Sequence, residues 1–189
     1  MKAILFDLDG TLIDSAPQLV GALNQLRLKY DLTPIPFLKG RPFASHGAAG
    51  LLKAGFDVIG FDPNPVCQKR LAKAGGRVAK SAAELGKQAT YIISSLPSAN
   101  ALIENAKAIA SSGKKGLIVA EASTLDLDDK AAAKKILDAK GIILLDCPLS
   151  GTGAQAKTKD LSIYSSGQSA AVKKMEHVFS GFAKANYYV

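Results

Sequence analysis

The chain has 189 residues, of which 48% are hydrophobic and 21% charged, and its formal net charge is +8. This length and balance fit a single globular domain with a sizeable core, and no apolar run reaches the ~18 residues of a membrane span. The lysines are spread through helical segments and arginines are few, which predicts a solvated basic surface that favours small anionic or phosphorylated ligands. This pattern argues against a nucleic-acid or membrane partner.

The first residues do not resemble a secretory signal, because Asp7 interrupts the apolar start after only four apolar residues. Cys67 and Cys147 are far apart and show no CxxC spacing, so two reduced thiols in the core are expected. Both observations favour a cytoplasmic location.

Short apolar runs alternate with amphipathic helical segments along the chain. The expected strands, in order, are Ala3–Phe6, Asp57–Phe61, Thr90–Ser95, Gly116–Ala120, Ile142–Leu145 and Leu161–Tyr164. The expected helices between them are Ala16–Tyr30, Ala44–Ala54, Pro65–Ala74, Ala99–Ser111 and Asp126–Ala139. Runs such as GLIVAEA and GIILLDC are typical of buried parallel strands, so the alternation predicts an α/β fold with helices on both faces of a sheet. Ligands of such folds bind at the carboxyl ends of the strands.

The stretch ILFDLDGTLIDS ends the first expected strand with two carboxylates. It resembles the signature of haloacid-dehalogenase-like phosphatases, and residues 1–55 continue in the manner of bacterial phosphoglycolate phosphatases. The resemblance implies that Asp7 is the nucleophile and a Mg²⁺ ligand, and that Asp9 is the second metal-site carboxylate and the general acid and base. Gly10 would permit the sharp turn that brings both carboxylates towards one centre. The alternative is that both are ordinary turn carboxylates.

From Leu51 onward, the stretches GLLKAGFDVIGFDPNP, IISSLPSA, LIVAEASTLD and LLDCPLSGTG follow one another in the order found in β-hydroxyacid dehydrogenases. Residues 51–189 thus resemble the NAD-binding domain of that family, which includes 3-hydroxyisobutyrate dehydrogenase. A carboxylate at the position of Asp62 would accept hydrogen bonds from the adenosine ribose and disfavour a 2′-phosphate. The resemblance implies cofactor-binding roles for Asp62, Leu96, Pro97, Ser123 and Thr124, and substrate-binding roles for Ser150 and Gly151.

Several parts of the dehydrogenase pattern are replaced. The phosphate-binding GxGxxG motif aligns with residues 39–44, where Lys39 and Arg41 occupy the first two glycine positions. Arg41 should keep the backbone from approaching a pyrophosphate. Thr152 stands where the family usually has glycine. The family continues beyond FAKANYYV into a helical domain with its catalytic lysine, so we expect no complete dehydrogenase.

These observations favour a chimera, of natural or engineered origin, in which a phosphatase-like head (1–55, with a helical and loop insertion at 16–43) precedes a dehydrogenase-like segment (51–189). We expect one Rossmann-like three-layer α/β domain over 1–189, with a mostly parallel sheet of order 3-2-1-4-5 and a sixth strand at Leu161–Tyr164. Its catalytic machinery would be incomplete, and it would hold no cofactor. We expect it to be a monomer or to self-associate weakly. The alternatives are a weak Mg²⁺-dependent phosphatase and a module that retains NAD or adenine-nucleotide binding without turnover.

Overall fold

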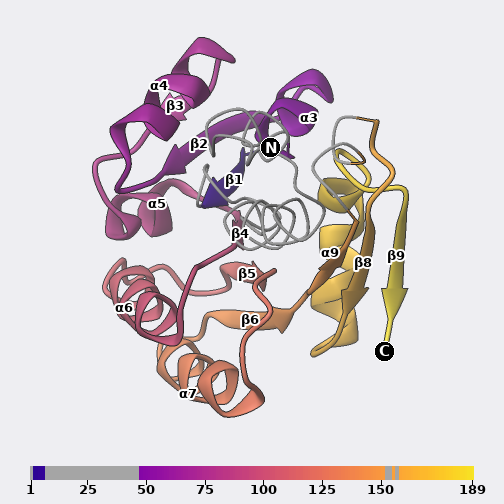
Figure 1. Cartoon of the computed structure of the whole chain (residues 1–189). Coiled ribbons are helices and arrows are strands. Elements are labelled where there is room, and N and C mark those ends of the chain that lie inside the picture. Colours follow the sequence, from indigo (N-terminus) through magenta and orange to yellow (C-terminus); the bar gives the residue numbers. More distant parts are fainter. Residues whose placement is uncertain (1, 7–46, 152–154, 156–157) are drawn as a thin grey trace, which may run out of the picture.

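The computed structural model describes residues 2–6, 47–151, 155 and 158–189. Its main element is a six-stranded parallel sheet. The strands are β1 (Lys2–Phe6), β2 (Asp57–Phe61), β3 (Arg77–Val78), β4 (Tyr91–Ser94), β5 (Ile118–Glu121) and β6 (Ile143–Asp146). Their order is β3-β2-β1-β4-β5-β6, so the first strand lies in the middle of the sheet (Figure 1).

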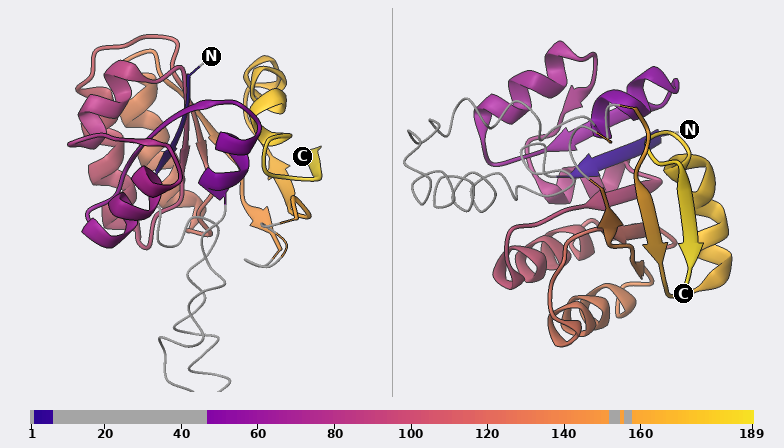
Figure 2. Two further views of the ribbon diagram at one scale, coloured as in Figure 1. Left: turned by 90° about the horizontal axis from the view of Figure 1, so that it is seen from above. Right: turned by 45° about the vertical axis from the view of Figure 1, so that its right-hand side comes forward.

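Helices follow the strands and cover both faces of the sheet. They are α3 (Gly47–Lys53), α4 (Pro65–Lys73), α5 (Ala82–Gln88), α6 (Ala99–Ala110), α7 (Leu127–Asp138) and α9 (Ser169–Phe179). Figure 2 shows α3 and α9 on one face of the sheet and α5, α6 and α7 on the other. The described part of the chain therefore has three layers.

The strands divide the core into two hydrophobic clusters. One cluster, here called the α3–α9 cluster, lies between the sheet and these two helices, and the other, the α5–α6–α7 cluster, lies on the opposite face. Successive residues of a strand point to opposite faces. In β5, for example, Ile118 belongs to the α3–α9 cluster and Val119 to the α5–α6–α7 cluster. Ile92 and Ile93 of β4 divide in the same way. Both faces need apolar residues, which explains why the central strands are continuous hydrophobic runs.

A second, smaller sheet extends the domain beyond β6. It contains β7 (Leu149–Ser150), β8 (Ser162–Ser165) and β9 (Ala185–Tyr188), in which β8 pairs antiparallel with β7 and parallel with β9. An isolated bridge between Asp146 and Ser166 connects the two sheets. This sheet lies beside α9 (Figure 1).

Helix α3 and the segment after α9 approach each other at two glycines. A Cβ atom on Gly181 would lie 2.8 Å from Leu51 Cδ2, and one on Gly50 would lie 3.2 Å from the Gly181 carbonyl oxygen. Leu51 is fully buried at this contact. The glycines let α3 pack closely enough for Leu51 to reach the core.

The sheet order and the α/β class confirm the prediction from the sequence, whereas some elements differ. The strands β3, β7 and β9 and helix α5 were not among the expected elements. The strand expected at Leu161–Tyr164 exists as β8, but it belongs to the second sheet and is not a sixth strand of the first. The expected helix Ala16–Tyr30 lies outside the described residues. Among the described helices, none is long and apolar enough to cross a membrane.

The packing of α3 gives a test of the fold. Truncation of Leu51 to alanine leaves a cavity in the α3–α9 cluster, so we expect the free energy of unfolding to fall by roughly 2–5 kcal/mol. The matched control is Leu127→Ala, because Leu127 is 77% exposed at the start of α7. This control should change the stability by less than about 0.5 kcal/mol. Urea unfolding of both variants measures the difference, and equal losses would contradict the packing described.

Candidate functional site

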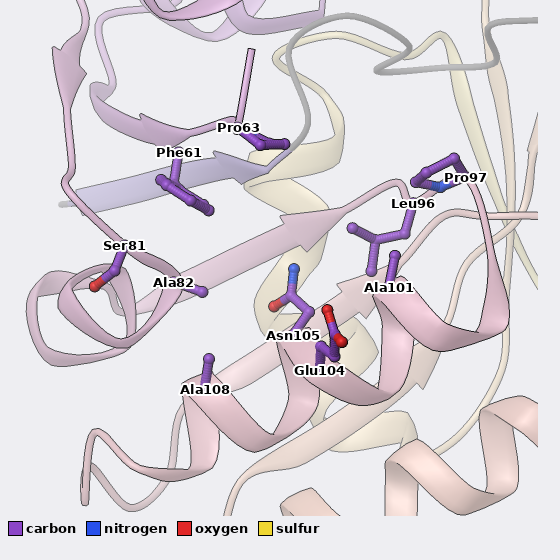
Figure 3. Close-up of a pocket in the computed structure, with 10 residues that line it drawn as sticks. All are labelled: Phe61, Pro63, Ser81, Ala82, Leu96, Pro97, Ala101, Glu104, Asn105 and Ala108. Carbon is purple, nitrogen blue, oxygen red and sulfur yellow. The ribbon is translucent and has the colours of Figure 1, made fainter. Parts of the chain in front are cut away.

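A pocket opens at the carboxyl ends of β2 and β4, where parallel sheets of this kind bind ligands. Its volume is about 450 Å³. Figure 3 shows its walls, which come from the end of β2, the start of α5, the loop after β4 and one face of α6. The lining residues are Phe61, Pro63, Ser81, Ala82, Leu96, Pro97, Ala101, Glu104, Asn105 and Ala108. Most of this surface is apolar, as in sites for flat organic groups.

Local capping interactions fix the helices that form these walls. The Ser81 hydroxyl accepts a hydrogen bond from the Glu84 amide at 3.2 Å, and the Glu84 carboxylate accepts one from the Lys80 amide at 2.7 Å. The Ser98 hydroxyl caps α6 by accepting from the Ala101 amide at 3.2 Å. Serine at these positions satisfies amides that have no partner within the helix, so α5 and α6 start at defined points.

Asp62 lies between the pocket residues Phe61 and Pro63, and the turn that follows β2 depends on it. Its Oδ1 accepts a hydrogen bond from the Asn64 amide at 2.6 Å, and its carbonyl oxygen accepts one from Gln68 Nε2 at 2.7 Å. Asp62 is only 2% exposed. The carboxylate thus stands at the predicted strand end, and it also holds the backbone of the pocket rim.

A buried charged cluster lies behind the loop that carries Leu96. Lys130 Nζ is 3.1 Å from Glu121 Oε2 and also pairs with Asp146 Oδ1. It donates a further hydrogen bond to the Ser123 carbonyl oxygen at 2.6 Å. Glu121 is fully buried and Lys130 is 7% exposed. A buried charge requires such partners, so the ends of β5 and β6 are held together through α7.

Ser123 connects this cluster to the pocket wall. Its amide donates to Glu121 Oε1 at 2.9 Å, its hydroxyl also donates to Oε1, and the hydroxyl oxygen accepts from the Leu96 amide at 2.6 Å. The position of Leu96 in the pocket therefore depends on Ser123 and, through it, on Glu121.

Burial raises the pKa of Glu121, and the Ser123 hydrogen bond and the Lys130 charge offset part of that shift. Burial also raises the pKa of the neighbouring Cys147 thiol, and the Asp146 and Glu121 carboxylates add to this effect. Cys147 is therefore held as a thiol, which makes it a poor nucleophile.

The structure brings together some of the residues singled out in the sequence. Leu96 and Pro97 line the pocket, and Ser123 holds Leu96 from behind. Thr124 is exposed outside the lining, and Ser150 lies in the second sheet, with Gly151 following it at a φ of +139°. Asp7, Asp9 and the segment 39–44 lie outside the described residues.

Sequence reasoning missed the walls contributed by α5 and α6. Two patterns in the sequence point to them. Ser81 followed three residues later by Glu84 is a capping signal for a helix start. Ala101, Asn105 and Ala108 recur at helical spacing on one face of α6, where small side chains leave a hollow. Nothing in the sequence pattern marks Lys130 as buried.

The arrangement of strands defines the class of protein. The order 3-2-1-4-5-6 of a parallel sheet, with a pocket at the carboxyl ends of its central strands, is that of a Rossmann-type domain. Residues 40–189 match the family described as the NAD binding domain of 6-phosphogluconate dehydrogenase, and the chain belongs to this family. The match confirms the dehydrogenase-type resemblance of the second part of the sequence.

Individual relatives agree with this family. L-threonate dehydrogenase of Cupriavidus necator is 30% identical over 74% of this chain and 48% of its own length, and mouse mitochondrial 3-hydroxyisobutyrate dehydrogenase is 30% identical over 71% and 41%. The chain thus spans less than half of these curated relatives. A solved structure of 3-hydroxyisobutyrate dehydrogenase from Mycobacterium tuberculosis matches all of this chain and 54% of its own, with a TM-score of 0.77 and 21% identity.

A relative of a different kind is the phosphoglycolate phosphatase of Caulobacter vibrioides. It is 51% identical to this chain over 57 residues, which are 30% of this chain and 24% of the phosphatase. Within the described residues, no group of three or more His, Cys, Asp or Glu side chains could hold a metal ion.

The buried cluster predicts a pH-dependent stability. Lys130→Met removes the cation beside the fully buried Glu121, so we expect a loss of roughly 3–5 kcal/mol near pH 8. The pKa of Glu121 is higher in the folded protein than its ordinary value of 4.5 in the unfolded chain. Such a carboxyl group stabilises the folded state at low pH, and this stabilisation is lost as the pH rises from 4.5 through the pKa of the folded state. Without Lys130 that folded pKa rises further. The loss in the variant should therefore be smaller at pH 5 than at pH 8, as measured by urea unfolding.

The double variant Glu121→Gln/Lys130→Met is the control for this prediction. It contains no charge at either position. Its loss in free energy of unfolding should therefore differ between pH 5 and pH 8 no more than that of unrelated variants. A loss in Lys130→Met that is equal at both pH values would show that the Glu121 charge is not what Lys130 stabilises.

Proposed function

We propose that this chain is a chimeric Rossmann-type domain that binds adenine nucleotides, with NAD as the dinucleotide that fits best. The observation that carries the proposal is the pocket between β2 and α6, which lies where the adenosine half of a dinucleotide binds in this fold. Membership in an NAD-binding family supports it. The relatives' reactions on threonate or 3-hydroxyisobutyrate are not assigned to this chain.

The residues of the pocket fit an adenosine group. Phe61, Leu96 and Pro97 offer apolar surface to a flat ring, and the hollow above Ala101 and Ala108 leaves room for it. Asp62 directly precedes the lining residue Pro63, and we propose that its carboxylate accepts hydrogen bonds from the ribose hydroxyls and repels a 2′-phosphate. We therefore propose that NAD binds more tightly than NADP. When bound, the dinucleotide would supply hydride chemistry at its nicotinamide end, towards which we place Ser123 and Thr124.

The chimeric origin is supported by the two separate similarities, one to an NAD binding domain over residues 40–189 and one to a phosphatase over 57 residues. The strand Lys2–Phe6 pairs in parallel with both β2 and β4, as the first strand of the dehydrogenase domain would. We propose that the head and the remainder fold as one domain in this way.

Ser150 and Gly151 are proposed to hold a substrate carboxylate.

A pocket-filling variant tests the proposed function. Ala108→Phe places a ring in the hollow, so we expect the affinity for NAD and for AMP to fall at least about tenfold. Ala132→Phe, which introduces the same side chain on the exposed surface of α7, should bind as the unchanged protein does. Isothermal titration of both variants measures the difference. Binding of neither NAD nor AMP to the unchanged protein would overturn the proposal.

A second candidate function is the Mg²⁺-dependent hydrolysis of a phosphomonoester by Asp7 and Asp9. The 51% identity to a phosphoglycolate phosphatase over 57 residues favours it, together with the motif FDLDGT. The expected result is release of phosphate from an aryl phosphate that requires Mg²⁺ and falls roughly 10²-fold or more in Asp7→Asn. Asp128→Asn on the exposed surface of α7 is the control. Release that is absent, or equal in both variants, would exclude this candidate.

A further inference from the structure

The pocket contains a polar group that the described structure leaves without a partner. Asn105 Oδ1 is buried, and it accepts no hydrogen bond from any of the described residues. Figure 3 shows the Asn105 carboxamide in the middle of the pocket, with Phe61 and Ala82 on one side and Leu96 on the other. An unsatisfied buried acceptor costs stability, so its place among apolar walls points to a donor brought by a ligand.

The chemistry of a carboxamide identifies the kind of ligand group that would satisfy it. Asparagine offers an acceptor beside a donor, and adenine offers the complementary pair of an amine and a ring nitrogen, which gives a bidentate contact. Adenine has a ring nitrogen on either side of its amine, so the pairing is possible for either orientation of the Asn105 amide. A purine with hydrogen in place of the amine has no donor on this edge, whereas a 6-oxopurine has a donor only at its ring N1–H, beside an acceptor oxygen.

We propose that Asn105 makes the pocket selective for 6-aminopurines by accepting a hydrogen bond from the exocyclic amine. This inference rests on the proposed function, because it assigns the base that occupies the same pocket. Glu104 also favours 6-aminopurines over 6-oxopurines. Its carboxylate lines the pocket one residue away and only accepts hydrogen bonds, so it repels the carbonyl oxygen that a 6-oxopurine carries in place of the amine.

The test compares AMP with two analogues in the unchanged protein. Purine riboside 5′-monophosphate lacks only the amine, and inosine 5′-monophosphate carries an oxygen instead. We expect AMP to bind roughly 3- to 10-fold more tightly than purine riboside 5′-monophosphate, as expected for one neutral hydrogen bond, and inosine 5′-monophosphate to bind no better than the latter. Isothermal titration or NMR shifts of α6 residues measure these ratios.

Two matched variants on the same helix separate selectivity from packing. Asn105→Leu keeps the approximate size of the side chain and removes the acceptor, so the ratio between AMP and purine riboside 5′-monophosphate should fall to about one. Asn100→Leu makes the same exchange at an exposed position of α6 and should leave the ratio unchanged. Because Asn105→Leu removes a buried unsatisfied group, its urea midpoint should be equal to or higher than that of the unchanged protein.

The outcomes are distinguishable. If AMP and purine riboside 5′-monophosphate bind equally to the unchanged protein, the selectivity inference is wrong and the proposed function stands. If Asn105→Leu still binds AMP more tightly than purine riboside 5′-monophosphate by the same factor, the role of Asn105 is likewise wrong. If AMP and NAD do not bind at all, the proposed function itself fails, and the inference fails with it.

Discussion

A parallel strand in the middle of a sheet must satisfy its hydrogen bonds on both edges, and the rest of this domain depends on that requirement. Lys2–Phe6 does so between β2 and β4, with Phe6 in register with Phe61. The pairing is made by backbone atoms, so it sets few demands on the identity of the side chains beyond apolar character on both faces. Strands of quite different sequence can therefore take this position, provided that both of their faces are apolar.

The pocket shows how polar groups in a buried site depend on one another. Leu96 is held by Ser123, Ser123 by Glu121, and Glu121 by its ion pair with Lys130. The hydrogen bonds give the buried Ser123 hydroxyl and Glu121 Oε1 their partners, and the ion pair places a cation beside the buried Glu121 carboxylate. Asn105 differs, because its acceptor has no such partner among the described residues. Asn105 therefore lies outside this chain of contacts, which is why we propose that its acceptor pairs with a ligand.

The sequence predicted the sheet order and most strands because buried parallel strands leave continuous apolar runs. It did not predict β3, because Arg77–Val78 is a short, exposed edge strand without such a run. Leu96 and Pro97 were identified as candidate site residues because a characteristic sequence surrounds them. The α6 wall and Lys130 were missed because their roles arise only from how a helix face packs against a distant strand. Lys130 and Asp146 are 16 residues apart, and no local pattern connects them.

The close approach of Gly50 and Gly181 limits how segments of such domains can be exchanged. A residue with a Cβ atom at position 50 would meet the Gly181 carbonyl oxygen at 3.2 Å, so α3 or the segment after α9 would have to shift slightly. Any sequence that supplies this helix therefore packs best with glycine at this position. The same holds for position 181, near the other end of the chain, where a Cβ atom would lie 2.8 Å from Leu51 Cδ2. The choice of residues at the start of this domain is thus restricted by the close approach of α3 to the segment after α9, at the opposite end of the chain.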